Sequence, residues 1–136
     1  MKNYHMKNHF DIIKNFLIEL NYSITYENKD DGILMVQKES DGIKNLILGV
    51  ANPILIMEQY IFKINNASEG IFKQLLQKNR DIIHGAFTLD ETGEKVIFRD
   101  TLQLENLDLN EFEGSINSLS LLLSEYSEQI IEFSKY

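Results

Sequence analysis

The sequence predicts an α+β domain with a mostly antiparallel sheet of about five to six strands and three helices, in the order α-β-β-β-β-α-β-β-α. Apolar residues recur at helical spacing near both ends of the chain and once in its middle. Between these stretches lie short strand-like runs bounded by turn residues such as Asp31-Gly32 and Asp41-Gly42. Because hairpin turns join most of these runs and no βαβ crossover is required, the strands are expected to pair antiparallel.

The strongest helical signal lies in residues 108–136. Asp108 can accept from the backbone N–H of Glu111, and Glu111 can reach back to the N–H of Asp108, as in a capping box. Leu107 and Phe112 are placed to form a hydrophobic staple across this cap. An apolar seam at heptad spacing follows and is expected to pack on the sheet, with pairing between subunits as the alternative. Its members are Phe112, Ile116, Leu119, Leu123, Tyr126, Ile130 and Phe133.

The remaining elements are assigned from their periodicity. A first helix is expected over residues 5–21, with an apolar stripe of Phe10, Ile13, Leu17 and Leu20. A second helix is expected over 67–80, opened by a capping box of Asn66 and Glu69. Strands are expected at 22–27, 33–38, 43–51, 54–64, 84–89 and 95–104.

The strand expected at 54–64 supplies the candidate partner-binding residues. Its alternation places Ile54, Ile56, Tyr60, Phe62 and Ile64 on one face, and Leu55, Met57 and Ile61 on the other. If helices cover only one face of the sheet, some of Leu55, Met57 and Ile61 are exposed and form a docking surface for a partner or a second copy. The alternative is that both faces are covered.

Composition bounds the class of protein. The chain has 136 residues, which fits one domain spanning residues 1–136. Its net charge of −8 disfavours nucleic acid and anionic membranes as partners and favours basic ones. There is no cysteine, no secretory signal and no apolar run long enough to span a bilayer, so a cytoplasmic location without membrane insertion is expected.

Catalytic, metal and cofactor signals are weak. His5 and His9 are four residues apart, but two ligands without a third do not make a metal site, so no metal is expected. No nucleophile elbow or phosphate-binding loop is present, and neither catalytic residues nor a cofactor are predicted. A carboxylate-based hydrolase remains an alternative if His84, Asp90, Glu94 and Asp100 converge in one cleft. Asp100 lies on an otherwise apolar strand face, where it could pair with Arg99 or a helix cation, or mark a bulge.

Three segments resemble a known family. Leu75-Leu76-Gln77-Lys78-Asn79 resembles its "LLxxN" helix end. Gly85–Asp90, Gly93 and Lys95–Arg99 resemble its "G-x-F-x-L-D…G-x-V-x-F-R" hairpin, and Leu102–Leu104, Leu107 and the last helix resemble its C-terminal run. On these residues the chain resembles the YbjN family and the related CesT/Tir-type chaperones of type III secretion.

The resemblance implies a fold and a class of function. It implies a small acidic α+β protein without enzymatic activity, usually a homodimer, whose chaperone members hold an effector polypeptide in extended form. We therefore expect a non-catalytic protein-binding module, a chaperone-like dimer that holds a polypeptide partner, such as a secreted effector, along apolar strand faces and edges. The alternative is a YbjN-like regulator or adaptor that acts through transient contacts.

Overall fold

Six strands form one antiparallel sheet in the order β1-β2-β3-β4-β6-β5. The computed structural model describes residues 8–65, 69–128 and 132. The elements are α1 (His9–Glu19), β1 (Ser23–Asn28), β2 (Ile33–Lys38), the 3-10 turn η2 (Glu39–Asp41), β3 (Ile43–Ala51), β4 (Ile54–Lys63), α2 (Glu69–Asn79), β5 (Ala86–Leu89), β6 (Lys95–Gln103) and α3 (Leu109–Glu125). The predicted fold class and element order are therefore confirmed.

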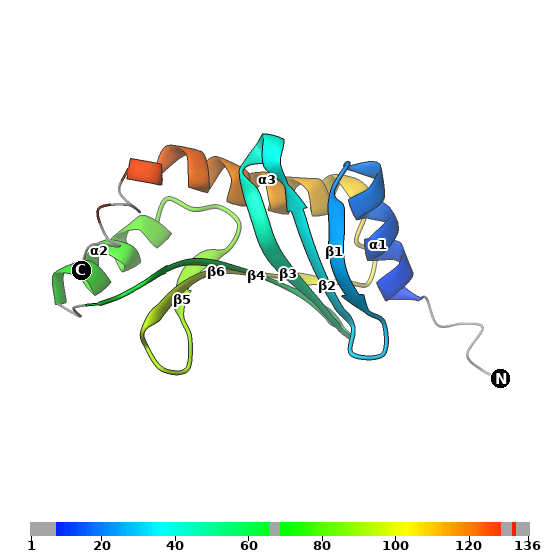
Figure 1. Cartoon of the computed structure of the whole chain (residues 1–136), viewed down its shortest axis with the longest axis horizontal. Helices are drawn as coiled ribbons and strands as arrows, with labels where there is room; N and C mark the ends of the chain where they lie inside the picture. The colour runs from blue at the N-terminus through cyan, green and yellow to red at the C-terminus, as the bar shows by residue number, and fades with distance from the viewer. Residues whose placement is uncertain (1–7, 66–68, 129–131, 133–136) are drawn as a thin grey trace.

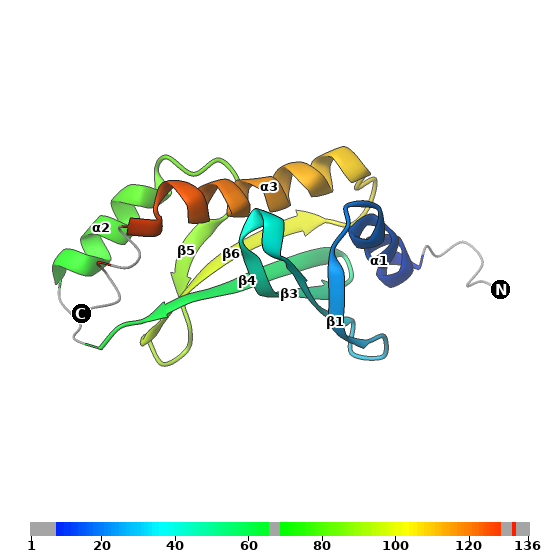
Figure 2. The ribbon, with the colours of Figure 1, turned by 45° about the horizontal axis from the view of Figure 1, so that its top comes forward.

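The three helices form one layer against the curved sheet (Figures 1 and 2). α3 runs across the strands, α1 lies beside β1 at one end, and α2 lies at the other. The ring centroids of Phe16 in α1 and Phe112 in α3 are 5.5 Å apart, so the two helices meet directly. No helix in the described parts of the chain is long and apolar enough to cross a membrane.

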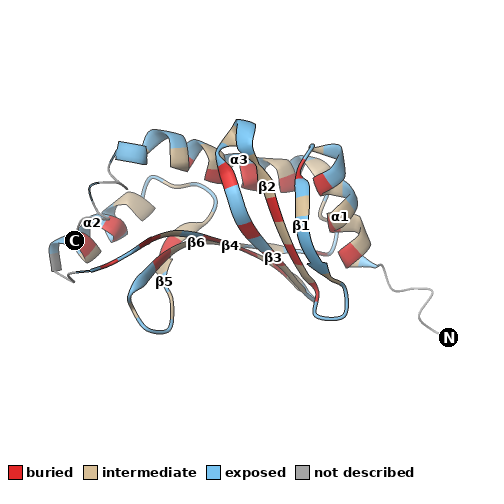
Figure 3. Cartoon of the chain, viewed as in Figure 1, coloured by how far each residue is buried: buried red, intermediate tan, exposed pale blue. Residues whose placement is uncertain are grey.

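The predicted seam of α3 faces the sheet. Asp108 caps the helix, and its Oδ1 accepts from the backbone N–H of Glu111 at 2.8 Å. Phe112, Ile116 and Leu119 are buried in the core. The seam continues with Leu123 and Tyr126, which are partly buried, while Ile130 and Phe133 lie outside the described residues. The expected packing of this helix on its own sheet is confirmed over the described range (Figure 3).

Element boundaries differ from the expectation by a few residues. Asn8 caps α1 by accepting from the backbone N–H of Asp11, and α2 begins at Glu69. The expected capping box at Asn66 falls outside the described residues. β3 and β4 meet at a turn that holds the cis Asn52–Pro53 peptide bond.

Asp100 has a partner that the sequence did not indicate. Its carboxylate accepts from the hydroxyl of Ser115, which is buried in α3. The predicted pairing of Asp100 with Arg99 is wrong, because Arg99 Nη1 lies 2.9 Å from Glu58 Oε2 on the other face of the sheet. A bulge at Asp100 is also absent, since its pairing with Met57 lies in an unbroken stretch of register. The Asp100–Ser115 bond therefore fastens β6 to the helix above it.

Candidate protein-binding surface

One face of the sheet carries no helix among the residues that the structure describes, and we call it the open face. The register aligns one row of residues across all six strands on this face: Tyr26, Met35, Ile47, Glu58, Arg99 and Ala86. The next rows add Ile33, Ile54, Ile56, Tyr60 and Ile97 to the same face. The alternation of buried and accessible residues along β2, β3 and β4 follows this register (Figure 3).

In this row the open face is apolar over β1, β2 and β3 and charged over β4 and β6. Tyr26 is 51% exposed, Ile47 is 38% exposed, and Met35 lies between them in the row. Glu58 and Arg99 come next and pair with each other, which leaves them without net charge. A partner therefore meets an apolar strip beside an ion pair that can hydrogen-bond its polar groups.

Gly49 leaves a position without a side chain in the second row. It lies between Ile33 and Ile56 in the register. A Cβ at this position would lie 3.9 Å from Ile33 Cδ1, which is ordinary contact distance. Alanine would fit at this position sterically, so the backbone does not require glycine there. The missing side chain leaves a shallow depression in the open face between the two isoleucines.

The exposed face of β4 is the opposite of the face expected from the sequence. Leu55 is 0% exposed and Met57 is 4% exposed, because both point into the helix layer. Ile61 is partly buried against the core at a β-bulge, where the register shifts between Tyr60 and Phe62. The expectation that Leu55 and Met57 are accessible is therefore wrong. A docking surface on this strand would instead use the residues of the opposite face before the bulge, such as Ile54, Ile56 and Tyr60.

One physical signal could have found the open-face residues. The strand over 43–51 is apolar on both faces around Ile47, which is typical of a strand with a second contact surface. Tyr26 carried no such signal. It reaches the open face only because a register shift between Ile24 and Tyr26 changes its side of the sheet.

The two edges of the sheet differ in accessibility. At the β5 edge, the Asn79 side chain accepts from the backbone N–H of Phe87 at 2.7 Å and donates to its carbonyl at 3.1 Å. The amide thus takes the place of a neighbouring strand and blocks pairing there. At the other edge, Ser23, Thr25 and Tyr26 of β1 are exposed. β1 is therefore the edge at which an extended peptide can add.

The groups named for a hydrolase do not converge. Asp90 and Glu94 belong to the turn between β5 and β6, where Asp90 Oδ1 accepts from Thr92 Oγ1 at 2.9 Å. Asp100 is roughly 17 Å further along β6, taking about 3.3 Å per residue from the strand's start, and faces α3. The condition on which the hydrolase alternative depends is not met.

The two histidines of the possible metal-binding pair, His5 and His9, are not seen together in a metal site within the described residues. His9 Nδ1 donates to Asn52 Oδ1 at 2.6 Å, which ties α1 to the β3–β4 turn. His5 lies outside the described residues. Among the residues that the structure describes, no group of three or more potential metal ligands comes together.

The comparisons with known proteins place this fold. A family model, CesT_Tir_1, matches residues 6–136. The chain belongs to the CesT_Tir_1 family. No curated protein shows significant similarity to it.

Several solved structures share the fold of this CesT_Tir_1 family member, at low sequence identity. YbjN from E. coli, for which a role as a transcription regulator is suggested, is 15% identical with a TM-score of 0.66, over 88% of this chain and 91% of YbjN. ExsC, from its complex with ExsE, is 19% identical with a TM-score of 0.65, over 89% and 92%. The Yersinia pestis type III secretion chaperone SycH, in complex with a fragment of YscM2, is 14% identical with a TM-score of 0.59, over 93% and 99%.

Proposed function

We propose that this chain is a non-catalytic, chaperone-like dimer that holds a partner polypeptide on its open face and along the β1 edge. The observation that carries the proposal is the apolar row Tyr26–Met35–Ile47 on a sheet face without helices. Contiguous exposed apolar residues on a sheet are typical of interaction sites rather than of free surfaces. The similarity to ExsC and SycH, both solved with a polypeptide partner, supports the proposal.

The physical mechanism combines main-chain and side-chain contacts. A partner strand beside β1 gains backbone hydrogen bonds from an edge at which none of the described strands pairs. Its alternate side chains then point toward the open face beside Tyr26, while Ile47, two strands further in, offers apolar contact to a part of the partner that lies across this face. Because the binding uses the backbone and apolar side chains, it suits an extended, unfolded segment such as that of a secreted effector. The location is proposed to be the cytoplasm.

The groove between α2 and β5 is the proposed dimer interface. It has a volume of about 300 Å³ and an almost wholly apolar lining that includes Phe72, Leu76 and Leu89. Leu76 is 69% exposed and Leu89 is 44% exposed, which is unfavourable unless another molecule covers them. Since Asn79 prevents strand addition at this edge, a second copy would pack through side chains. Leu76→Glu should give a monomer by light scattering, while Gln74→Glu, exposed on the same helix, should not.

A pull-down from native cells tests the proposed function. The tagged chain is captured, separated by size with light scattering, and its companions are identified by mass spectrometry. We expect a dimer with one stoichiometric polypeptide. Ile47→Lys should reduce capture about tenfold, as loss of a central apolar contact does, without lowering the melting temperature. Ile18→Lys, at an isoleucine on α1 that is 55% exposed, is the matched control.

The same experiment distinguishes the regulatory alternative. A dimer without any stoichiometric companion would contradict the chaperone function and favour transient contacts, as suggested by the similarity to YbjN. Equal capture by Ile47→Lys and the unaltered chain would show that the partner binds elsewhere than the open face.

A further inference from the structure

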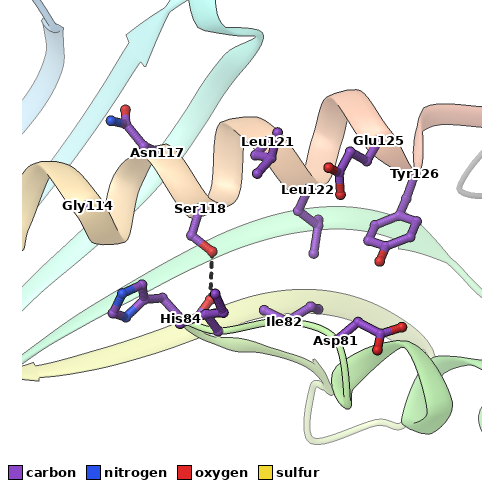
Figure 4. A pocket seen from close by; sticks show the side chains of 11 residues that line it. Asp81, Ile82, His84, Gly114, Asn117, Ser118, Leu121, Leu122, Glu125 and Tyr126 are labelled. Carbon is purple, nitrogen blue, oxygen red and sulfur yellow. Dashed lines mark hydrogen bonds between the residues drawn. The ribbon is translucent and has the colours of Figure 1, made fainter.

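A second surface combines an apolar cavity with carboxylates. The cavity has a volume of about 290 Å³ and lies between the loop that follows α2 and one face of α3 (Figure 4). Ile82 and Leu122 form its apolar interior, and Ile83 and Leu121 are also among its lining residues. Ile83 is 88% exposed and Leu121 is 58% exposed. Two large apolar side chains at the edge of the cavity are thus exposed to solvent.

The walls of this cavity are held in place by the chain itself. Ser118 Oγ donates to the carbonyl of His84 at 3.1 Å and joins the loop to α3. Gly85, next in the chain, has φ of 83°, and a Cβ there would overlap the Phe98 ring. Only glycine lets the loop approach β6 this closely. The cavity is therefore present before any ligand binds.

Gly114 leaves one end of the cavity open. It belongs to the interior of α3, where glycine is unfavourable relative to alanine. A Cβ at Gly114 would meet nothing within 4 Å, so the packing of the chain does not require glycine there. The helix thus has a solvent-accessible stretch of backbone beside the cavity, at the cost of helix propensity.

Carboxylates surround the other end. Asp81 from the loop and Glu125 from α3 lie on opposite walls, away from Gly114 and His84 (Figure 4). Neither forms an ion pair within the described part of the chain. Arg80, next to Asp81 in the chain, forms no ion pair in the part of the chain that the structure describes. Lys78, in the last turn of α2, has its Nζ over the Tyr126 ring, 5.3 Å from the centroid.

The charge of the whole molecule is concentrated in the same region. Residues 100–134 contain eight of the 21 acidic residues and none of the 13 basic ones. The rest of the chain has 13 of each sign, so this segment accounts for the full net charge of −8. A cationic ligand is therefore drawn toward α3 rather than toward the sheet.

We propose that the cavity between the 81–84 loop and α3 binds a basic segment of a polypeptide, with one apolar side chain of that segment seated against Ile83 and Leu121. Lysine or arginine residues flanking this anchor pair with Asp81 and Glu125. The inference rests on the proposed function only in taking a polypeptide as ligand, and it uses a surface distinct from the open face. Charge complementarity selects this occupant over a second copy of the chain, because the same acidic segment would face itself.

The test uses a synthetic peptide with one leucine flanked by lysines, titrated into the full-length protein at low ionic strength and followed by amide chemical shifts. We expect saturable shifts at Ile83 and Leu121, and weaker binding when the leucine is replaced by serine. Asp81→Asn combined with Glu125→Gln should weaken binding about two- to thirtyfold. Glu105→Gln, an exposed carboxylate of the same segment outside the cavity, is the matched control.

A second variant separates binding from folding. Gly114→Leu fills the open end of the cavity while favouring the helix, so it should reduce binding about tenfold without lowering the melting temperature. Equal losses with Glu105→Gln would show diffuse charge attraction and overturn the proposal. Loss of peptide binding with Ile47→Lys instead would assign the peptide to the open face. Absence of binding would also overturn it, while the proposed function stands or falls by the pull-down.

Discussion

Removing the side chain of Asn79 should both destabilise the domain and free the β5 edge. Asn79→Ala deletes two hydrogen bonds, of 2.7 Å and 3.1 Å, to the backbone of Phe87. Phe87 is only 7% exposed, so water has little access to its unpaired groups. At about 0.5–1.5 kcal/mol for each bond, the free energy of unfolding should fall by about 1–3 kcal/mol. At roughly 4 °C per kcal/mol, the melting temperature should fall by about 4–12 °C.

Asn79→Asp gives the sharper test of this reasoning. It keeps the shape and the acceptor for the Phe87 N–H but replaces the donor amide with an oxygen that faces the Phe87 carbonyl. It should therefore cost more than Asn79→Ala, since two acceptors then oppose each other. Urea unfolding measures both variants, and Gln77→Ala, exposed on the same helix, should change stability by no more than about 0.5 kcal/mol.

Two results would contradict the stabilising role of the Asn79 side chain. A loss below about 0.5 kcal/mol for Asn79→Ala would mean that the two bonds contribute little. A smaller loss for Asn79→Asp than for Asn79→Ala would mean that the donor is not needed. Because an unblocked edge can pair with other chains, Asn79→Ala should also elute from a sizing column as larger species at high concentration.

Three further predictions concern burial and charge. Met57→Asp should prevent folding, since it puts an unpaired charge at a position 4% exposed; a native-like melting transition in differential scanning fluorimetry would contradict this. Burial raises the pKa of Tyr22 well above its ordinary value, so the folded state retains this proton longer and stability should fall as pH rises above about 10, less steeply in Tyr22→Phe by urea unfolding. The backbone N–H of Lys95 lowers the pKa of Asp90, so the stability from this carboxylate should be lost as pH falls through that lowered pKa, and carboxyl carbon shifts should titrate below the ordinary range.

The elements could be predicted from local pattern, whereas the direction of side chains could not always be. The seam and cap of α3 depend on residues three and four apart in one helix, so the sequence contains them directly. The exposed face of β4 depends on where its pairing with β6 shifts, and no residue near Ile61 marks that shift. The prediction for Leu55 and Met57 failed because the alternation holds only as far as Tyr60. Beyond the shift, Phe62 is buried in the same core as Leu55 and Met57.

Contacts between different helices and strands could not be predicted from local sequence patterns either. Asn79 was identified as the last residue of the "LLxxN" helix end, but its bonds to Phe87 depend on how the following loop turns the chain back. Asp100 was identified as unusual for an apolar strand face, yet its partner Ser115 comes from a helix whose orientation local pattern does not determine. In both cases the residue was conspicuous and its partner was not.

Two register shifts decide what the open face presents. In β1 the shift after Ile24 aligns Tyr26 with Met35, where an unbroken ladder would align it with Leu34 and point it into the helix layer. In β4 the shift after Tyr60 has the opposite effect and returns Phe62 to the core, where it is 4% exposed. One bulge thus adds an aromatic ring to the open face, and the other withdraws one. The binding surface proposed here therefore depends on the pairing of strands, because the same residues in a regular ladder would present a different set of side chains.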